Sequence, residues 1–294
     1  MSVVAALDNW RHWQVATPLL AKPQAARTLS TGPHTTITQV IADTHDGPAL
    51  FVVRSPTTHG QTLAPSGPQQ ADHQRLAASK QLAPALRYVC GDSGTLVMDY
   101  IEPHPDQPND STSGAHDIGL SAGTLTSQSL ARLLNGIHAI AVSGKPLDFH
   151  AQLWIYTERA RERGAPKHEL VNPDHPSLKA AIALLASDTP VLCHNDLHSG
   201  NVLPTPEHLV AIDWEYSGMG SAYFDIACAA QGCPDTDTNK LIQLTLGESF
   251  SPQLWRCAQA VYAATEWNWY QASGLPKPTS CRLDTVVARL AAVD

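Results

Sequence analysis

The sequence contains no long apolar run, no closely spaced pair of cysteines and little charge. A membrane-spanning helix needs about 20 consecutive apolar residues, and the first eight residues have neither the basic start nor the apolar core of a signal peptide. The six cysteines form no CxxC motif, and no histidine is spaced to complete a zinc site with them. We therefore expect a cytoplasmic protein with reduced thiols and no membrane partner.

Charged residues make up only 16% of the 294 residues, and the formal net charge is −8. A nucleic-acid partner would require a basic stripe, which this acidic chain does not offer. An acidic protein suits a cationic substrate, although the net charge says little about any single site. The length and the hydrophobic content of 43% suffice for one large domain or two lobes. No feature of the sequence indicates an oligomeric state.

Polar residues surround a short apolar hairpin between residues 190 and 217. Residues 191–193, 202–203 and 209–212 have the pattern of short buried strands, and a polar turn separates the last two. In this arrangement the loop after the first strand faces the end of the last one. Asp196, Asn201 and Asp213 would then converge on one point.

Phosphoryl transfer requires the side chains that this stretch supplies. One carboxylate must orient a hydroxyl group and accept its proton, and we assign this catalytic role to Asp196. Mg²⁺ prefers hard oxygen ligands, and Asn201 and Asp213 supply an amide oxygen and a carboxylate. The spacing does not distinguish one Mg²⁺ ion from two. The alternative is a surface loop in which Asp and Asn serve only as turn residues.

Residues 194–201, His-Asn-Asp-Leu-His-Ser-Gly-Asn, and residues 212–216, Ile-Asp-Trp-Glu-Tyr, resemble the aminoglycoside phosphotransferase and choline kinase superfamily. Within it, they are most similar to the bacterial choline, ethanolamine or thiamine kinase branch. The resemblance implies an α+β, two-lobed, protein-kinase-like fold. A β-rich nucleotide-binding lobe would span 1–100, and a mainly helical catalytic and substrate-binding lobe would span 101–294. ATP would be the co-substrate and a small alcohol the acceptor.

Two hairpins are expected in the first lobe. Residues 37–41 and 49–54 flank an Asp-Gly turn, and residues 87–90 and 95–100 flank a second turn. In the resembled family, the loop before the first of these strands covers the ATP phosphates, which implies nucleotide contacts for Thr31 and Gly32. The end of the second hairpin is the hinge that binds adenine, which implies Met98 and Tyr100. Residues 55–70 have no apolar period and indicate a loop, with or without a lid function.

A cation at the end of the second strand grips phosphates in kinase-like folds. Arg54 occupies this position, and its forked guanidinium suits phosphate. The resemblance implies an acidic partner for Arg54 on a helix expected at 71–82, where Asp72 falls in place of the family's usual Glu.

The second lobe is expected to be helical. Apolar spacing predicts helices at 127–143, 149–164 and 176–187. A later helix should begin at Ser251, with Pro252 in its first turn, and end at Gly274. Asp225 matches a family signature and is expected to cap the start of a helix.

Three residues are candidates for acceptor binding. Glu215 would share a strand face with Asp213 and could reach a second Mg²⁺ or a substrate cation. Trp267 and Tyr270 are three residues apart on one helix face, and paired aromatics on a late helix enclose the quaternary ammonium in choline kinases. The alternative for the aromatic pair is ordinary core packing.

The identity of the acceptor stays open. A choline, ethanolamine or thiamine type of alcohol is our first interpretation, and an aminoglycoside or amino sugar is the second. A pseudokinase that binds nucleotide without turnover is a hypothesis of another class. The single glycine at Gly32, together with Arg54 and Asp72, leaves this hypothesis open, whereas the intact Asp196, Asn201 and Asp213 argue against it.

Overall fold

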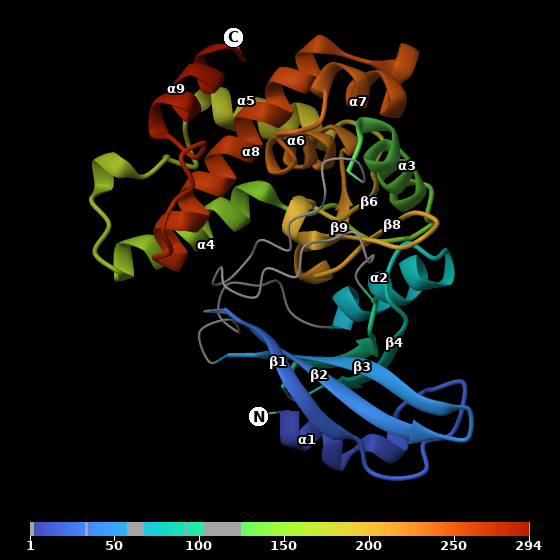
Figure 1. Cartoon of the computed structure of the whole chain (residues 1–294). Coiled ribbons are helices and arrows are strands. Elements are labelled where there is room, and N and C mark those ends of the chain that lie inside the picture. The colour runs from blue at the N-terminus through green and yellow to red at the C-terminus, as the bar shows by residue number, and fades with distance from the viewer. Residues whose placement is uncertain (1–2, 33–34, 58–67, 92, 103–124, 294) are drawn as a thin grey trace. The chain divides into compact units, whose positions relative to one another are not determined.

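The computed structural model describes residues 3–32, 35–57, 68–91, 93–102 and 125–293. The chain forms two compact units (Figure 1), and each is described by itself. The first comprises Met1–Gly136 and Asp196–Ser217, and the second comprises Ile137–Asn195 and Gly218–Asp294. The boundary between an N-terminal nucleotide lobe and a C-terminal acceptor lobe at residue 100 stays a prediction.

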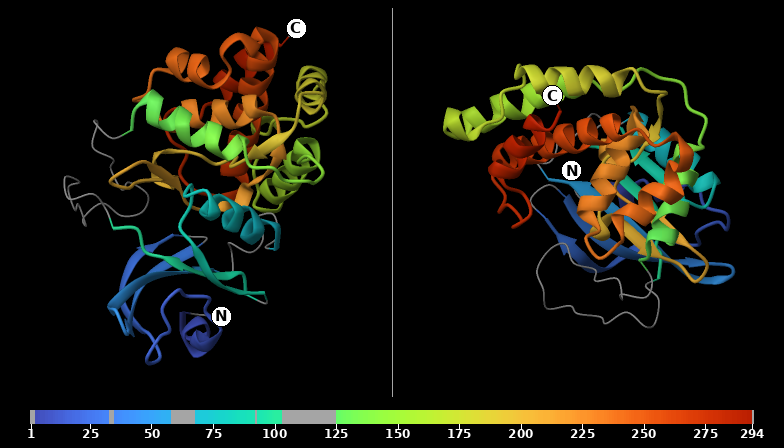
Figure 2. Two further views of the ribbon diagram at one scale, coloured as in Figure 1. Left: turned by 90° about the vertical axis from the view of Figure 1, so that its right-hand side faces the viewer. Right: turned by 90° about the horizontal axis from the view of Figure 1, so that it is seen from above.

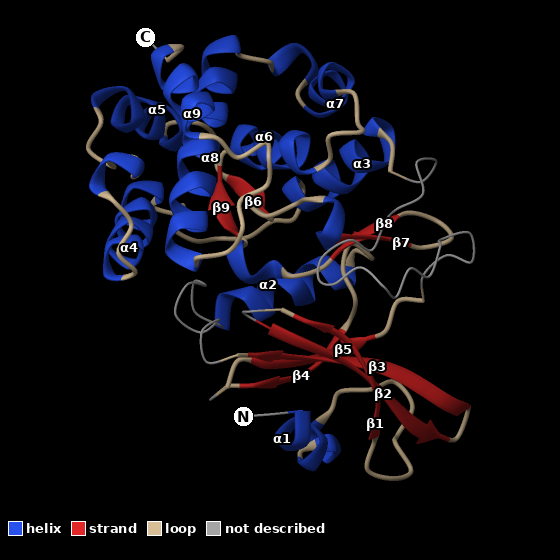
Figure 3. Cartoon of the chain, turned by 60° about the vertical axis from the view of Figure 1, so that its left-hand side comes forward, coloured by secondary structure: helices blue, strands red, loops and turns tan. Residues whose placement is uncertain are grey.

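The first unit is built on an antiparallel sheet. Among the described residues, five strands pair in the order β1-β2-β3-β5-β4 (Figure 3). Their bounds are β1 (Gln24–Thr31), β2 (Thr35–Thr44), β3 (Gly47–Pro56), β4 (Leu86–Cys90) and β5 (Thr95–Asp99). Both predicted hairpins are confirmed, as β2–β3 and β4–β5. Alternating apolar residues and a Gly in the tight turn explain this success.

Strand β1 corrects the expectation that only a loop, with Thr31 in it, precedes the strand predicted at 37–41. Gln24–Thr31 pairs with β2 as the edge of the sheet, with irregularities in its register. Nearly all of its residues are exposed, and its sequence is rich in small and hydroxyl side chains. The strand therefore lacks the apolar alternation by which a half-buried strand is found in a sequence.

Short elements pack around this sheet. Near the N-terminus lie helix α1 (Val3–Asp8) and a 3₁₀ turn at Trp10–His12. Trp13 is buried against Phe51 of β3, with ring centroids 5.4 Å apart. Helix α2 (Pro68–Ser79) lies three residues earlier than expected. The hairpin of β7 (Val202–Pro204) and β8 (Leu209–Ala211) completes the unit, and the Ala211 N–H donates to the Leu82 carbonyl at 2.8 Å.

The second unit is mainly helical (Figure 2). Helix α3 (Ser127–His138) ends five residues before its expected limit, and its last residues belong to this unit. Helices α4 (Phe149–Glu162) and α5 (Pro176–Ala186) confirm two predicted helices. The other described helices are α6 (Ala222–Gly232), α7 (Thr238–Thr245), α8 (Pro252–Ser273) and α9 (Leu283–Ala291). Strands β6 (Val191–Cys193) and β9 (Gly218–Gly220) pair antiparallel.

Helix α8 is the centre of the core of this unit. Buried side chains from α4, α5, α6 and α9 pack against it. Its predicted ends are confirmed: the Ser251 hydroxyl accepts from the Leu254 N–H, and Gly274 adopts φ 70°. A Cβ at Gly274 would meet only the movable guanidinium end of Arg163, so the left-handed backbone is the reason for glycine at this position.

The structure thus confirms the α+β class, with an antiparallel sheet in the N-terminal part and helices in the C-terminal part. In the part of the chain that is described, none of the helices has both the length and the apolar character needed to span a bilayer.

Candidate active site

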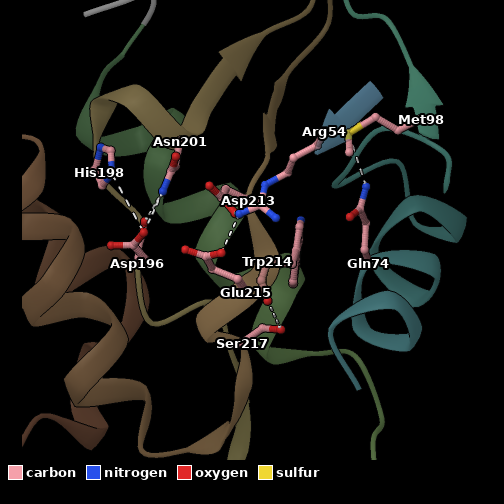
Figure 4. Close-up of polar contacts among 10 residues, drawn as sticks. All are labelled: Arg54, Gln74, Met98, Asp196, His198, Asn201, Asp213, Trp214, Glu215 and Ser217. Atoms are coloured by element: carbon pink, nitrogen blue, oxygen red, sulfur yellow. Dashed lines mark hydrogen bonds and ion pairs between the residues drawn. The ribbon is translucent and has the colours of Figure 1, made fainter. Parts of the chain in front are cut away.

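Asp196 and Asn201 are joined by a pair of hydrogen bonds (Figure 4). The Asn201 side-chain Nδ2 donates to the Asp196 carboxylate Oδ2 and to the Asp196 backbone carbonyl, both at 2.9 Å. These bonds orient the carboxylate of Asp196. Because Nδ2 is committed to them, Oδ1 is the Asn201 side-chain atom that can coordinate a cation.

The backbone links Asn201 to the other end of the hairpin. The Ile212 N–H donates to the Asn201 carbonyl at 2.9 Å, so Asp213 follows directly after a residue that is bonded to Asn201. The structure therefore brings Asp196, Asn201 and Asp213 together within the first unit, as the sequence predicts.

Asp213 lies in an unusual backbone conformation. Its φ and ψ are 62° and 66°, the left-handed region, at the start of a 3₁₀ turn formed by Trp214–Tyr216. Its Oδ1 atom is buried and makes no hydrogen bond in the described structure. A left-handed non-glycine backbone and a buried oxygen without a hydrogen bond are features that are enriched at functional sites.

Arg54 reaches this oxygen from β3. Its guanidinium NH2 lies 2.7 Å from Asp213 Oδ1, as an ion pair without the alignment of a hydrogen bond, and 2.5 Å from Glu215 Oε2. Only 5% of Arg54 is exposed. Burial alone would lower the pKa of Arg54, but the carboxylates of Asp213 and Glu215 outweigh burial and raise it. The guanidinium is therefore a fixed positive charge inside the site.

Glu215 lies in the 3₁₀ turn and not on the strand face that the sequence predicted, and its carboxyl group is largely buried. Burial, followed by the negative charge of Asp213, raises the pKa of Glu215 to about 7, although Arg54 acts in the opposite direction. One guanidinium faces two carboxyl groups, so a further cation would be electrostatically favoured beside Asp213.

The expected ion pair between Arg54 and Asp72 is wrong. The side chain of Asp72 is 69% exposed and bonds Arg75 on its own helix at 2.9 Å. The next residue, His73, faces inward, and its Nδ1 lies 3.0 Å from the Ser217 hydroxyl. Burial lowers the pKa of His73, so this link is a neutral hydrogen bond. The face of α2 that contacts Ser217 therefore carries His73, one residue after the predicted Asp72.

His198 is a residue of the motif to which sequence reasoning gave no role. The Gly200 N–H donates to His198 Nδ1 at 3.0 Å, which places the ring proton of the neutral imidazole on Nε2. That Nε2 lies 3.9 Å from Asp196 Oδ2 (Figure 4). Its place two residues after Asp196 is the signal that could have drawn attention to it.

The remaining nucleotide candidates lie in strands of the sheet or directly after them. Thr31 ends β1, and the Gly32 N–H donates to the Thr35 carbonyl at 2.8 Å; residues 33–34 lie outside the described part. Met98 is buried on β5, and its sulfur accepts from Gln74 Nε2 at 3.7 Å. The Tyr100 N–H donates to the Leu50 carbonyl at 3.2 Å. Most of the 55–70 loop also lies outside the described residues.

Asp225 is a structural residue of the second unit, but it is not the helix cap that we expected. The cap of α6 is Ser221. The fully buried carboxylate of Asp225 accepts from the His194 and Asn195 N–H groups at 3.1 and 2.8 Å, and it bonds His138 Nε2 at 3.0 Å. It therefore anchors the two residues that precede Asp196 in the chain.

His138, Cys193 and Asp225 also have the side-chain proximity of a metal site, since their ligand atoms lie within 4.8 Å of one another. Burial, with the charge of Asp225, raises the pKa of the Cys193 thiol well above its usual range. The carboxylate of Asp225 is already used by hydrogen bonds. We therefore interpret this group as a packed polar network.

The aromatic pair lies in the core of the second unit. Trp267 is 8% exposed, and its indole Nε1 donates to the Glu169 carbonyl at 2.6 Å. The ammonium of Lys277 lies 4.7 Å from the centroid of the Trp267 ring, so the cation that this ring attracts belongs to the chain itself. Tyr270 packs edge-on against Trp269 at 4.9 Å. The alternative of core packing therefore describes Trp267 better than the ammonium cage.

Comparisons with known proteins add a family match and a set of similar folds. The model of the phosphotransferase enzyme family matches residues 38–261. Among solved structures, the choline kinase of Streptococcus pneumoniae has a TM-score of 0.62 at 16% identity over 92% of this chain and 95% of that one. The ethanolamine kinase of Plasmodium vivax has a TM-score of 0.61 at 16% identity over 92% and 81%.

A more distant structure includes ligands. An amicoumacin kinase, determined with AMP-PNP, Ca²⁺ and Ami, has a TM-score of 0.51 at 11% identity over 100% of this chain and 93% of that one. No curated protein sequence matches this chain. At these identities the structural likeness establishes the protein-kinase-like fold alone.

Proposed function

Because this chain belongs to the phosphotransferase enzyme family, we propose that it transfers the γ-phosphoryl group of ATP to a hydroxyl group of a small, cationic metabolite. The observation that carries the proposal is the pair of hydrogen bonds from Asn201 to Asp196, which orients one carboxylate beside a second carboxylate, Asp213. Such a pair of carboxylates with an amide is what phosphoryl transfer requires of a protein.

Each polar group in the site has a distinct role in this proposal. Asp196 orients the acceptor hydroxyl and takes its proton as the oxygen attacks the γ-phosphorus, and ADP leaves with the electrons of the broken P–O bond. Arg54 holds the phosphates of the nucleotide through its forked donors. His198 lies beside Asp196, with its Nε2 3.9 Å from Asp196 Oδ2, which is too far for a hydrogen bond in this structure.

The residues present fit a magnesium ion. The buried, hydrogen-bond-free Oδ1 of Asp213 and the Oδ1 of Asn201 are hard oxygen atoms of the kind that Mg²⁺ prefers. When bound, Mg²⁺ would neutralise the charge of the phosphates. The surrounding protein supplies the orientation of both ligands, through the bonds from Asn201 Nδ2 and from the Ile212 N–H.

A choline, ethanolamine or thiamine type of acceptor is the first choice. It is supported by the choline and ethanolamine kinases among the similar structures and by the net charge of −8. An aminoglycoside or amino sugar is the second candidate, because the amicoumacin kinase shares the fold. The oriented pair of Asp196 and Asn201 argues against a pseudokinase, for which this geometry would have no use.

The test is release of ADP from Mg²⁺-ATP in the presence of choline, ethanolamine, thiamine, amino sugars or kanamycin, with Asp196→Asn as the blank. Acceptor-dependent release above the blank on one of the first three alcohols is the expected result. Release of ADP with kanamycin alone would support the second candidate, an aminoglycoside or amino-sugar acceptor. ATP binding without release on a wide panel of alcohols would contradict phosphotransferase activity.

A further inference from the structure

The structure places the acidic partner of Arg54 in an unexpected part of the chain. A kinase-like fold pairs its phosphate-binding cation with an acid on the following helix. In this protein the acid of that helix, Asp72, is exposed and bonded to Arg75, whereas Arg54 contacts Glu215, 161 residues further along the chain. A buried guanidinium needs a carboxylate partner, and Glu215 provides one.

The segment that carries Glu215 is firmly held. Trp214 is fully buried, and its indole Nε1 donates to the Ala211 carbonyl at 3.0 Å. The Ser217 N–H and hydroxyl both donate to the Trp214 carbonyl, at 3.0 and 2.7 Å. The 3₁₀ turn between them therefore presents the Glu215 carboxylate to Arg54 in a fixed position (Figure 4).

Helix α2 is connected to the same segment by neutral contacts. Ser217 gives its proton to Trp214, so it accepts from His73 Nδ1. Gln74, the next residue, bonds the Pro84 carbonyl and Met98 and does not reach the acids. The helix thus supports the turn, and the charge that pairs with Arg54 comes from the turn itself.

Asp213 and Glu215 have different positions with respect to Arg54. Asp213 Oδ1 lacks hydrogen-bond alignment with the guanidinium and is the oxygen best suited to a metal ion, whereas Glu215 Oε2 makes a hydrogen bond with Arg54 NH2. Building on the proposed function, we propose that Glu215 is a positioning residue that holds Arg54 for the phosphates of ATP, in place of an acid on α2.

Measuring the ATP affinity with and without Mg²⁺ distinguishes the positioning of Arg54 by Glu215 from a role of Glu215 as a metal ligand. The contact of Arg54 with phosphate does not need Mg²⁺, so Glu215→Gln should weaken binding of ATP about tenfold both in Mg²⁺ and in EDTA, by the loss of a charge-assisted hydrogen bond. If Glu215 instead served only as a metal ligand, the loss would appear with Mg²⁺ and vanish in EDTA, and the proposal would fail.

A double-mutant cycle adds a second test. In an Arg54→Gln background, Glu215→Gln should change the ATP affinity in EDTA less than twofold, because its partner is gone. Asp72→Asn should leave the ATP affinity at the wild-type value. A tenfold loss of ATP affinity in Asp72→Asn would show that Asp72 is the partner of Arg54 and would overturn the proposal. Glu215→Asp keeps the charge on a shorter side chain and is the control for a folding defect. It should retain a higher ATP affinity than Glu215→Gln.

Failure of the proposed function would look different. A wild-type protein that binds ATP, transfers nothing and loses affinity in Glu215→Gln would contradict the phosphotransferase activity and support the positioning role. Normal turnover of the wild-type protein, together with an unchanged ATP affinity in Glu215→Gln, would support the phosphotransferase activity and contradict the positioning role. Each binding measurement is made by calorimetry on the full chain, so it does not depend on the identity of the acceptor.

Discussion

Two polar groups, one in each unit, differ in how completely their hydrogen bonds are satisfied. Around Asp213 in the first unit, buried polar atoms remain without hydrogen-bond partners, and the backbone is left-handed. Around Asn268 on α8, the side chain accepts from the Val171 N–H at 3.0 Å and donates to the Val171 carbonyl and the Thr157 hydroxyl at 2.9 and 3.0 Å.

This difference separates a reactive site from a structural one. A network whose members are all satisfied stabilises the fold and has nothing left for a ligand. An incompletely satisfied network weakens the fold unless a ligand completes it. By the same criterion Trp267 is a core residue, because its N–H and its ring face are both used. The Oδ1 atom of Asp213, which has no hydrogen bond, supports the proposed role of Asp213 in metal binding.

The largest effect is expected at Asp196. Asp196→Asn removes the group that accepts the hydroxyl proton but keeps its size, so turnover should fall about 10²–10⁴-fold while ATP affinity stays close to wild type. Steady-state kinetics and calorimetry measure the two quantities. Glu207→Gln, an exposed acid in the β7–β8 turn, is the matched control and should behave as wild type. Equal rates in Asp196→Asn and wild type would remove the catalytic role.

The next effect is expected at Asp213. Asp213→Asn should weaken the binding of Mg²⁺-ATP about a hundredfold, because a carboxylate is lost from the proposed metal site. Its melting temperature should not fall, since asparagine tolerates the left-handed backbone and the buried charge disappears. Calorimetry and thermal unfolding test the pair of outcomes. A lower melting temperature with unchanged affinity would make Asp213 a structural residue.

Asn268 should show the opposite behaviour. Asn268→Ala leaves the Val171 N–H and carbonyl unpaired in the core, so the free energy of unfolding should fall by about 2–3 kcal/mol with little change in ATP affinity. Denaturant unfolding measures this loss. Asn172→Ala, an exposed asparagine nearby, should change stability by less than about 0.5 kcal/mol. A similar loss of unfolding free energy in Asn268→Ala and Asn172→Ala would contradict the structural role of Asn268.

The smallest expected effect is on the pH dependence of the free energy of unfolding. Burial would raise the pKa of Asp225, but hydrogen bonds from His138 and from the loop outweigh burial and lower it. Its stabilising contribution is therefore present above the ordinary Asp pKa of about 3.9 and is lost as the pH falls through the lower folded-state value. Asp225→Asn should be less stable near neutral pH and lose less stability on acidification. Parallel acid unfolding curves for the two proteins would count against this linkage.

Local signals were sufficient for much of the fold. The alternation in β2 and β3 and the Ser251, Pro252 and Gly274 signals at α8 depend on neighbouring residues, and the structure confirms them. The exposed strand β1 has no such signal, because its surface does not require apolar residues. The catalytic motif also lies within a short stretch, which is why Asp196, Asn201 and Asp213 could be grouped from the sequence.

Contacts between distant residues could not be predicted in this way. The partner of Arg54 depends on which face of α2 turns inward, and a shift of one residue replaces Asp72 by His73. The role of Trp267 depends on Glu169 and Lys277, which approach it only in the folded unit. A sequence pattern identifies the side chains that can do chemistry, and the structure identifies those whose polar atoms are still available.

The most direct test of the account is ³¹P nuclear magnetic resonance of a reaction mixture that holds the full chain, Mg²⁺-ATP and the acceptor panel. The account predicts a new phosphomonoester signal that grows with the ADP signals and is absent with Asp196→Asn. A spectrum in which ATP stays unchanged with every alcohol, or in which Asp196→Asn forms the ester as fast as wild type, would contradict it.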